Sequence, residues 1–465
     1  MENAVIRINR VTLTNIKNVK YGSIDLNKVN SSGFGSSIVG VYGQNGSGKT
    51  TLIWAMEIVK DALSGVSLPE DSAYYIRQSA TSASICVEFL VKLNERDYSA
   101  LYSIEFSKTE NNRIAIIREG LEYSAKSYNN LPQIKRRKIL EINYPLSLAE
   151  NINTCFYKPD NRISEWGAVD KQVRQKLLVI QALAREKKQS FIFNKQVVDI
   201  YNDTNVNKLH LDIINALMFY GRMNLFVLNR NSESSYNMYL LPLSMRIESN
   251  NTITKSDSMP IGLGRNIIDK NVFNRIQRVI EQIDILIGKI IPGLHVEITN
   301  KENQLNQKGE EMVAFDLVSN REGVITPLRY ESEGIKKILC ILSSLIAMYN
   351  NESVFVAIDE MDAGIFEYLL GEILDVINKT GKGQLLFTSH NMRPLEVLDN
   401  INIYFTTTNP ENKYIQFTGI KENNNLRNTL LRTIDLGGQK ESIYESTSSY
   451  EIGKAFRKAG ESTNV

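Results

Sequence analysis

Hydrophobic and polar residues alternate along most of the first 125 residues, which is the pattern of half-buried β-strands. Short runs of this kind occur at residues 11–16 and 37–42, and a longer series fills residues 84–121. Because polar turn residues at 94–97 and 110–112 divide the longer series, it predicts an antiparallel meander. Residues 51–63 are instead apolar at helical spacing, and they follow a glycine-rich loop.

The pattern changes near residue 150. Helical periodicity appears at residues 171–188, 207–223 and 272–291, and the last of these runs ends at a Pro-Gly pair. Residues 232–264 are polar and lack apolar periodicity, which predicts a long mobile loop. None of the helical runs carries sustained heptads, so no coiled-coil arm is expected.

The last third of the chain alternates between strands and helices. Strands are predicted at 313–318, 354–358, 384–388 and 401–406, and helices at 334–348 and 366–378. The run at 354–358 is apolar throughout, as in a strand buried inside a parallel sheet. The pattern predicts an α/β protein in which residues 1–149 and 293–465 form one core and residues 150–292 are a helical insertion.

Composition and charge narrow the class of protein. The chain is 42% hydrophobic and carries 54 basic against 52 acidic residues, a net charge of +2. This charge balance argues against a protein that binds nucleic acid over its whole surface, so DNA is not the favoured partner. Three scattered cysteines have no metal-ligand spacing. No apolar run approaches the about 18 residues that span a membrane, and the first residues do not read as a signal peptide, so we expect a cytoplasmic protein.

A phosphate-binding loop is the strongest chemical signal. The chain contains the pattern G-x-x-x-x-G-K-[ST] between a predicted strand and a predicted helix, the context that this motif requires. Glycines let backbone N–H groups curl around phosphates, Lys49 reaches the β- and γ-phosphates, and Thr50 ligates Mg²⁺. The predicted binding residues for ATP are Gly43, Gln44, Asn45, Gly46, Ser47, Gly48, Lys49, Thr50 and Thr51.

Two acids end the apolar strand at 354–358. A carboxylate at the carboxyl end of a parallel strand lies beside the phosphate loop, where Asp359 can hold Mg²⁺ and Glu360 can orient the attacking water. About 310 residues separate these acids from Lys49, so a large segment lies between the two motifs. We predict that Glu360 and Lys49 are catalytic.

Further candidates follow the same logic. Ser332 is a natural N-cap for the helix at 334–348. Besides capping, Ser332, Glu333 and Gly334 could form a second γ-phosphate site, which would serve the nucleotide of a neighbouring copy. His390 follows the strand after the acidic strand and is predicted to sense the γ-phosphate and act in catalysis, whereas His210 and His295 are predicted to be structural.

Taken together, these motifs resemble an ABC-type ATPase head of the RecF/SMC-like and OLD-related group. The resemblance covers residues 1–125 and 310–410 and adds a D-loop-like segment at residues 362–364. It implies an ATP-sandwiching homodimer, within a larger ring in some relatives. It also implies nucleotide contacts from Asn15 and Lys17, and Gln78 as a further link to Mg²⁺.

Residues 359–368 resemble most the stand-alone ATPases of antiphage systems, in particular the AriA-type ATPases of PARIS. About 75 residues follow His390, too few for the TOPRIM nuclease domain that OLD proteins append. The resemblance thus implies a regulatory ATPase that holds a nuclease effector encoded nearby until a phage protein triggers its release. A RecF-like repair ATPase that binds DNA as an ATP-closed dimer is the alternative. The basic run at 135–138 is read as a solvated face.

Overall fold

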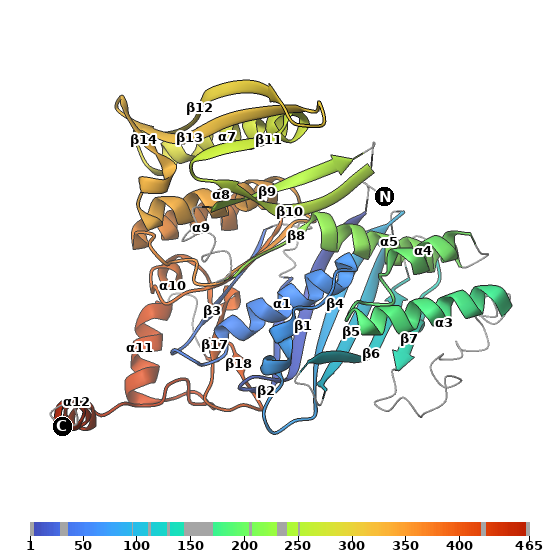
Figure 1. Ribbon diagram of the computed structural model, residues 1–465. Helices are drawn as coiled ribbons and strands as arrows, with labels where there is room; N and C mark the ends of the chain where they lie inside the picture. Colours follow the sequence, from blue (N-terminus) through green and yellow to red (C-terminus); the bar gives the residue numbers. More distant parts are fainter. Residues whose placement is uncertain are drawn as a thin grey trace.

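Figure 1 shows the protein as a computed structural model. The structure describes residues 4–27, 36–94, 96–109, 113–127, 131–143, 171–203, 207–229, 240–249, 252–419 and 425–461. Two six-stranded sheets, one antiparallel and one mainly parallel, form the larger part of it. A smaller sheet with its own helix lies at the top of Figure 1.

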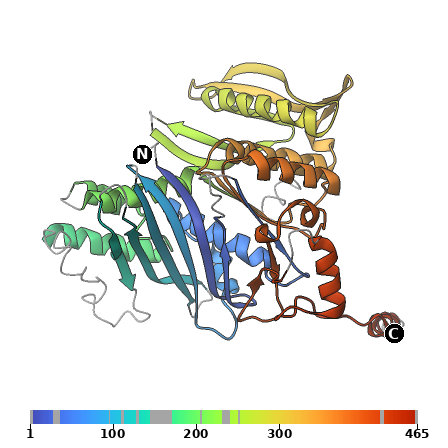
Figure 2. The same cartoon turned by 180° about the vertical axis from the view of Figure 1, so that it is seen from behind.

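The antiparallel sheet is built from the alternating patterns of the first third of the chain. Its strands are, in spatial order, β2 (Val19–Asp25), β1 (Val5–Ile16), β4 (Ser82–Leu93), β5 (Arg96–Lys108), β6 (Ile114–Ala125) and β7 (Ile134–Asn143). Figure 2 shows this sheet on the near side of the molecule. The predicted meander is therefore confirmed. The basic run at 135–138 lies on β7, an edge strand, where exposed charge discourages further strand pairing.

The strands of the second sheet lead into the predicted motifs. Its order is β18 (Tyr414–Ile415), β17 (Ile403–Thr406), β3 (Ser37–Tyr42), β16 (Gln384–Thr388), β15 (Phe355–Ile358) and β8 (Leu225–Leu228). The five strands from β17 to β8 are parallel, so their carboxyl ends meet at one edge. Ligands bind at this edge in parallel sheets.

A hydrophobic core covers each face of the parallel sheet. Val39, Val41 and Ala357 belong to the core that includes α1 (Lys49–Ser64) and the antiparallel sheet. Ile38, Val356 and Ile358 belong to the core on the opposite face. That second core includes α8 (Glu333–Asn350) and α9 (Glu367–Thr380). The strands therefore alternate between two buried faces, as the apolar run at 354–358 predicts.

The segment between the two halves is not entirely helical. It contains α3 (Lys171–Glu186), α4 (Lys195–Asn202), α5 (Lys208–Met223) and α7 (Lys270–Ile290). It also supplies β8 to the parallel sheet and β11 (Arg265–Asp269) to the small sheet. The boundaries at residues 149/150 and 292/293 stay a prediction, but the described part of the insertion is mixed α/β.

The prediction of a long loop at residues 232–264 is wrong for most of that segment. Residues 231–239 and 250–251 lie outside the described residues, whereas β9 (Leu240–Ser249) and β10 (Thr252–Gly262) pair as antiparallel strands. The small sheet above them consists of β11, β13 (Glu311–Arg321), β12 (Leu294–Leu305) and β14 (Val324–Pro327), with α7 against it. The chain ends in α10 (Pro394–Val397), α11 (Leu426–Leu436) and α12 (Ser449–Glu461).

Candidate nucleotide site

The phosphate loop connects β3 to α1 at the carboxyl edge of the parallel sheet. Gly46 and Gly48 have φ angles of 74° and 110°, in the left-handed region that favours glycine. Gly48 caps α1 without any side-chain hydrogen bond to the first turn, so the free N–H groups of the helix face the loop. Lys49 Nζ donates to the carbonyl oxygens of Gly43 (2.7 Å) and Gln44 (3.0 Å). This geometry is an anion-binding cradle with a lysine at its base.

Asp359 lies beside this cradle, directly after β15. Its Oδ1 accepts hydrogen bonds from Thr50 (3.2 Å) and Thr388 (2.7 Å). The residue is 2% exposed, and its Oδ2 has no hydrogen-bond partner in the described part of the chain. A buried carboxylate oxygen without a partner is costly unless a cation or water satisfies it. The hydroxyl of Thr50 and this carboxylate are oxygen ligands of the kind that Mg²⁺ takes, so the residues fit the predicted metal.

Glu360 adopts a backbone conformation that is rare for its type. Its φ is 47°, a left-handed value that costs about 1–3 kcal/mol in a residue other than glycine. Thr388 stabilises this conformation, because its Oγ1 accepts from the Glu360 N–H (2.7 Å) while donating to Asp359. The Met361 N–H also bonds the Thr388 carbonyl (2.9 Å). Thr388 therefore positions both acids, and no sequence motif identified it.

A pocket of about 830 Å³ lies over the loop and brings most of the predicted residues together. Its wall consists of Lys17, Asn18, Asn45, Gly46, Ser47, Gly48, Lys49, Thr50, Thr51, Glu360 and His390. Gln44 lines a second pocket of about 360 Å³, which shares Asn18, Asn45, Gly46 and Ser47 with the first. The phosphate loop, Glu360 and the β1–β2 turn therefore line a single cavity.

The β1–β2 turn reaches the pocket through Lys17 and Asn18. Lys17 Nζ lies 3.8 Å from the ring centroid of Tyr75, and that ring stacks on Trp54 at 3.9 Å. Asn18 Nδ2 donates to the Gly46 carbonyl (2.5 Å), a contact that the sequence analysis did not single out. Asn15 does not line the pocket, and its carbonyl accepts from the Arg77 N–H.

Gln78 is not brought to the pocket. It is exposed in the turn that follows Ile76 and is absent from the pocket wall. Its predicted role at the metal therefore has no support from its position. Among the described residues, no cluster of three or more His, Cys, Asp or Glu side chains is arranged to hold a metal.

The D-loop-like segment connects the remaining candidates. Asp362 Oδ2 accepts from the backbone N–H groups of His390 (3.1 Å) and Asn391 (3.0 Å), which fixes His390 at the pocket wall. Gly364 contacts Gly334 so closely that a Cβ on Gly334 would collide with the Gly364 carbonyl oxygen. The segment therefore links the pocket to the start of α8.

Ser332, Glu333 and Gly334 do not line the pocket of their own chain. Ser332 Oγ caps α8 by accepting from the Ile335 N–H (3.3 Å), as the capping interpretation predicts. Glu333 Oε1 accepts from Lys336 Nζ (3.1 Å). The side chains of Ser332 and Glu333 are nevertheless exposed, so capping leaves them open to a second molecule.

The phosphate loop follows β3, the carboxylate Asp359 follows β15, two strands away in the parallel sheet, and Thr388 bonds this carboxylate from the end of β16 between them. These features define a mixed α/β P-loop ATPase. Residues 7–393 match the family model AAA_15, described as an AAA ATPase domain, and the chain belongs to this family. The predicted fold class is thereby confirmed. Among curated proteins, none matches the chain.

Solved structures of ATPase heads are similar to this chain over most of their length. An SmcHead bound to the C-winged helix domain of ScpA is 15% identical, with a TM-score of 0.44 over 88% of this chain and 97% of that one. The SMC head domain from Thermotoga maritima is 13% identical, with a TM-score of 0.35 over 88% and 99%. The recombination mediator protein RecF is 12% identical, with a TM-score of 0.37 over 89% and 99%. None of the described helices is both long and apolar enough to cross a membrane.

Proposed function

We propose that the chain binds and hydrolyses Mg-ATP in the pocket above the phosphate loop. The observation that carries the proposal is that Lys49 and Glu360 line this pocket while Asp359 accepts a hydrogen bond from Thr50 on its wall. Lys49 and the N–H groups at the start of α1 neutralise the phosphates. Thr50 and Asp359 hold Mg²⁺, which when bound offsets charge on the β- and γ-phosphates.

Glu360 is proposed as the general base that orients the attacking water. It lies on the wall of the same pocket as Thr50, and its backbone is held by Thr388. His390, on the same wall, is proposed to contact the γ-phosphate. Because Asp362 accepts a hydrogen bond from the His390 N–H, a movement of this histidine would shift the D-loop-like segment. Gly364 of that segment contacts Gly334, so the movement would reach the start of α8.

A second copy of the chain is proposed to complete the site. Ser332 and Gly334 lie outside their own pocket, although their helix N-terminus and hydroxyl suit an anion. Two copies related by a two-fold axis can each present this turn to the nucleotide of the other. The smallest active unit is therefore an ATP-sandwiching homodimer, on which a larger ring could be built.

Mixing two inactive variants tests this sharing. Lys49→Ala removes the phosphate lysine and Ser332→Arg blocks the presented turn, so each variant alone should be inactive. A heterodimer of the two has one doubly damaged site and one intact site. With random exchange, about a quarter of wild-type ATPase activity should return, because half of the dimers regain one of two sites. Full activity in a chain that stays monomeric at every concentration would refute the shared site.

The biological role that we propose is regulatory. The resemblance of residues 359–368 to AriA-type ATPases of PARIS suggests an ATP-driven switch that restrains a TOPRIM-type nuclease until a phage protein is sensed. The described part of residues 150–292 is the candidate for holding that partner, because it joins the ATPase core through β8 and presents α3 and α4 at the surface.

Phage plating tests the regulatory role. Cells expressing the chain with its neighbouring gene should show fewer plaques than cells without them. Lys49→Ala and Glu360→Gln should each remove this protection, because both stop the ATP cycle. Protection that survives both substitutions would show that ATP does not drive the switch.

A further inference from the structure

A segment near the end of the chain contacts the phosphate loop. We call residues 438–448, between α11 and α12, the C-terminal strap. Its Glu445 N–H donates a hydrogen bond to the side-chain Oε1 of Gln44 (3.0 Å). Glu445 and Ile443 also line the pocket of about 360 Å³ to which Gln44 belongs. The family match ends at residue 393, so it does not include the strap.

Gln44 is the residue through which this contact reaches Lys49. Its side chain accepts the hydrogen bond from the strap, and its backbone carbonyl accepts from Lys49 Nζ (3.0 Å). The same carbonyl accepts from the Ser47 N–H (3.2 Å), which closes the turn of the phosphate loop. A rotation of Gln44 would therefore displace an oxygen that orients the phosphate lysine.

The strap is anchored by a carboxylate to the turn between β17 and β18. Glu441 accepts hydrogen bonds from the side-chain amides of Asn409 (3.1 and 3.2 Å) and Asn412 (3.2 Å). Because both amides donate to this one side chain, Glu441 fixes the strap four residues before its contact with the phosphate loop.

Backbone and apolar contacts add to this anchor. The Ser442 carbonyl accepts from the Thr408 N–H (2.8 Å), and Ile443 is 6% exposed within the second hydrophobic core. The end of β17 also supports the phosphate loop directly, since Thr406 Oγ1 donates to Ser47 Oγ (2.7 Å). The strap and the phosphate loop are therefore held by the same part of the parallel sheet.

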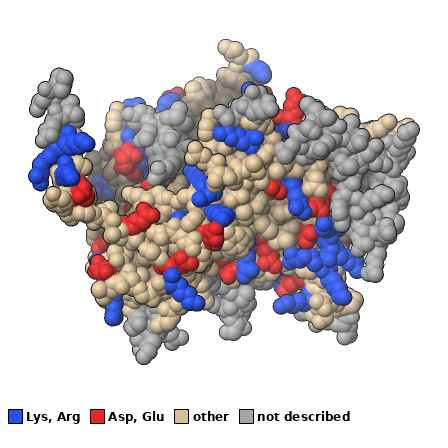
Figure 3. All heavy atoms as spheres, turned by 90° about the horizontal axis from the view of Figure 1, so that it is seen from below, with Lys and Arg blue, Asp and Glu red and all other residues tan. Residues whose placement is uncertain are grey.

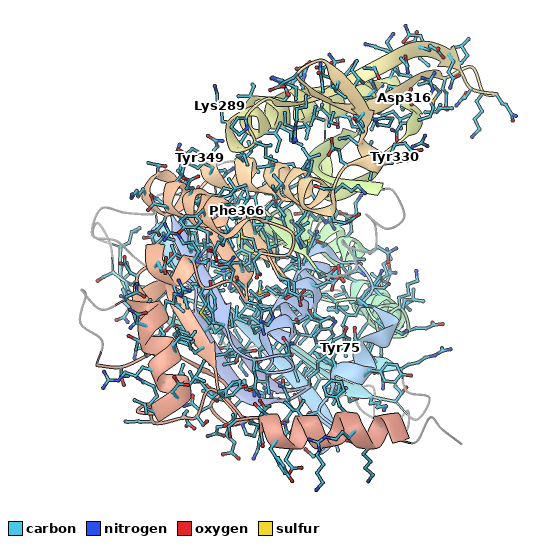
Figure 4. The ribbon with its side chains drawn as sticks, turned by 90° about the vertical axis from the view of Figure 1, so that its left-hand side faces the viewer. Tyr75, Lys289, Asp316, Tyr330, Tyr349 and Phe366 are labelled. Atoms are coloured by element: carbon cyan, nitrogen blue, oxygen red, sulfur yellow. The ribbon has the colours of Figure 1, made fainter. Side chains whose placement is uncertain are left out.

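Helix α12 continues from the strap. It begins four residues after Glu445. Figure 3 shows α12 projecting from the body, and in Figure 4 it lies at the lower edge of the molecule. The strap therefore joins a projecting helix to the phosphate loop.

We propose that the C-terminal strap is a positioning element of the nucleotide site. By holding Gln44, it keeps the Gln44 carbonyl aimed at Lys49 Nζ, so the loop is preorganised for phosphates. The strap lines the second pocket, whereas Thr50 and Glu360 line the first, so the strap sets nucleotide affinity and not the chemical step. This proposal rests on the ATP site proposed above.

ATP binding and turnover by Glu441→Ala test the proposal. Without this carboxylate the strap loses its bonds to the β17–β18 turn, so the dissociation constant and KM for ATP should each rise about fivefold, the contribution of one hydrogen bond. The kcat should stay unchanged, because Glu360 keeps its place. Calorimetric titration and steady-state phosphate release measure these values. Glu441→Gln keeps an oxygen that accepts from the same amides, so it should retain most of the affinity.

Glu411→Ala is the matched control. Glu411 lies in the same turn, and its carboxylate pairs with Lys20 at the surface. The substitution removes an acid and an ion pair but none of the strap contacts described above. ATP affinity should therefore change less than about twofold.

Gln44→Ala shows whether the strap acts through Gln44. Alone, it should weaken ATP binding about fivefold, because the Glu445 N–H loses its acceptor. Combined with Glu441→Ala it should weaken binding no further, since the two substitutions break the same connection. Additive losses would mean that the strap does not act through Gln44, and the proposal would be wrong.

Hydrogen exchange of the strap gives the reciprocal measurement. A strap that favours ATP binding must itself be stabilised by bound ATP, so ATP should slow exchange of the Glu445 N–H about fivefold. Mass spectrometry of peptides that cover the strap measures this change, which should disappear in Gln44→Ala.

The remaining outcomes separate this proposal from the proposed function. Unchanged ATP affinity in Glu441→Ala would overturn the role of the strap and leave the nucleotide site standing. A lower kcat at constant KM would show that the strap only supports the amount of folded protein, which also overturns the proposal. If Lys49→Ala binds ATP as the wild type does, the nucleotide site itself is wrong, and the strap proposal falls with it.

Discussion

Substituting Glu360 by Gln will leave ATP binding intact and lower ATP turnover about 10²–10⁴-fold, the usual contribution of a general base. Gln has the same shape and keeps the backbone bond from residue 360 to Thr388, so the pocket is preserved. It lacks the carboxylate that accepts a proton from water. Calorimetric titration with ATP and steady-state phosphate release measure the two effects separately.

Glu322→Gln is a matched control for this substitution. Glu322 also has a positive φ, 53°, but it lies in the turn between β13 and β14 and is exposed. Its substitution should change neither binding nor turnover. Wild-type turnover in Glu360→Gln would mean that another group activates the water, and the assignment of Glu360 would then be wrong.

Lys49→Ala will abolish ATP binding at ordinary nucleotide concentrations. The ammonium group is largely buried and is already oriented by the Gly43 and Gln44 carbonyls, so it meets the phosphates with little loss of freedom. Removing one partner of a buried charged pair costs about 3 kcal/mol or more, which is at least a hundredfold in affinity. Fluorescent nucleotide titration measures this loss.

Lys20→Ala provides the comparison for Lys49→Ala. Lys20 pairs with Glu411 at the surface and is about half exposed, so its removal should alter ATP affinity less than twofold. An unchanged affinity in Lys49→Ala would place the nucleotide somewhere other than the phosphate loop.

Local patterns in the sequence predicted most of the helices and strands. The strands that were not predicted depend on pairing between segments that are distant in the sequence. Residues 37–42, 84–121 and 354–358 show their strand character within a few neighbours. In contrast, β8 is only four residues long and follows α5 after a single residue, so its strand state depends on pairing with β15. The β9–β10 hairpin was missed although residues 241–247 alternate, because Pro242 inside this run disfavours a strand and the residues on either side of it are mostly polar.

The candidate site was predictable wherever a motif has fixed spacing. The phosphate loop, Glu360 and His390 meet at one pocket as expected. The hydroxyl of Thr388 bonds both Asp359 and the Glu360 backbone, and Asn18 bonds the Gly46 carbonyl, but a lone threonine or asparagine has no sequence pattern that reveals such a role. Asn15 and Gln78 came from resemblance alone, and neither lines the pocket.

The pairing of β3 has a consequence for synthesis of the protein. In its sheet, β3 pairs with β16 and β17, and Thr406 at the end of β17 lies 364 residues after Tyr42. At about 5–20 residues per second, the ribosome needs roughly twenty to seventy seconds to add those residues. During that time the phosphate loop lacks its supporting strands. We therefore expect that a nascent or truncated chain without β16 and β17 does not bind ATP at the phosphate loop.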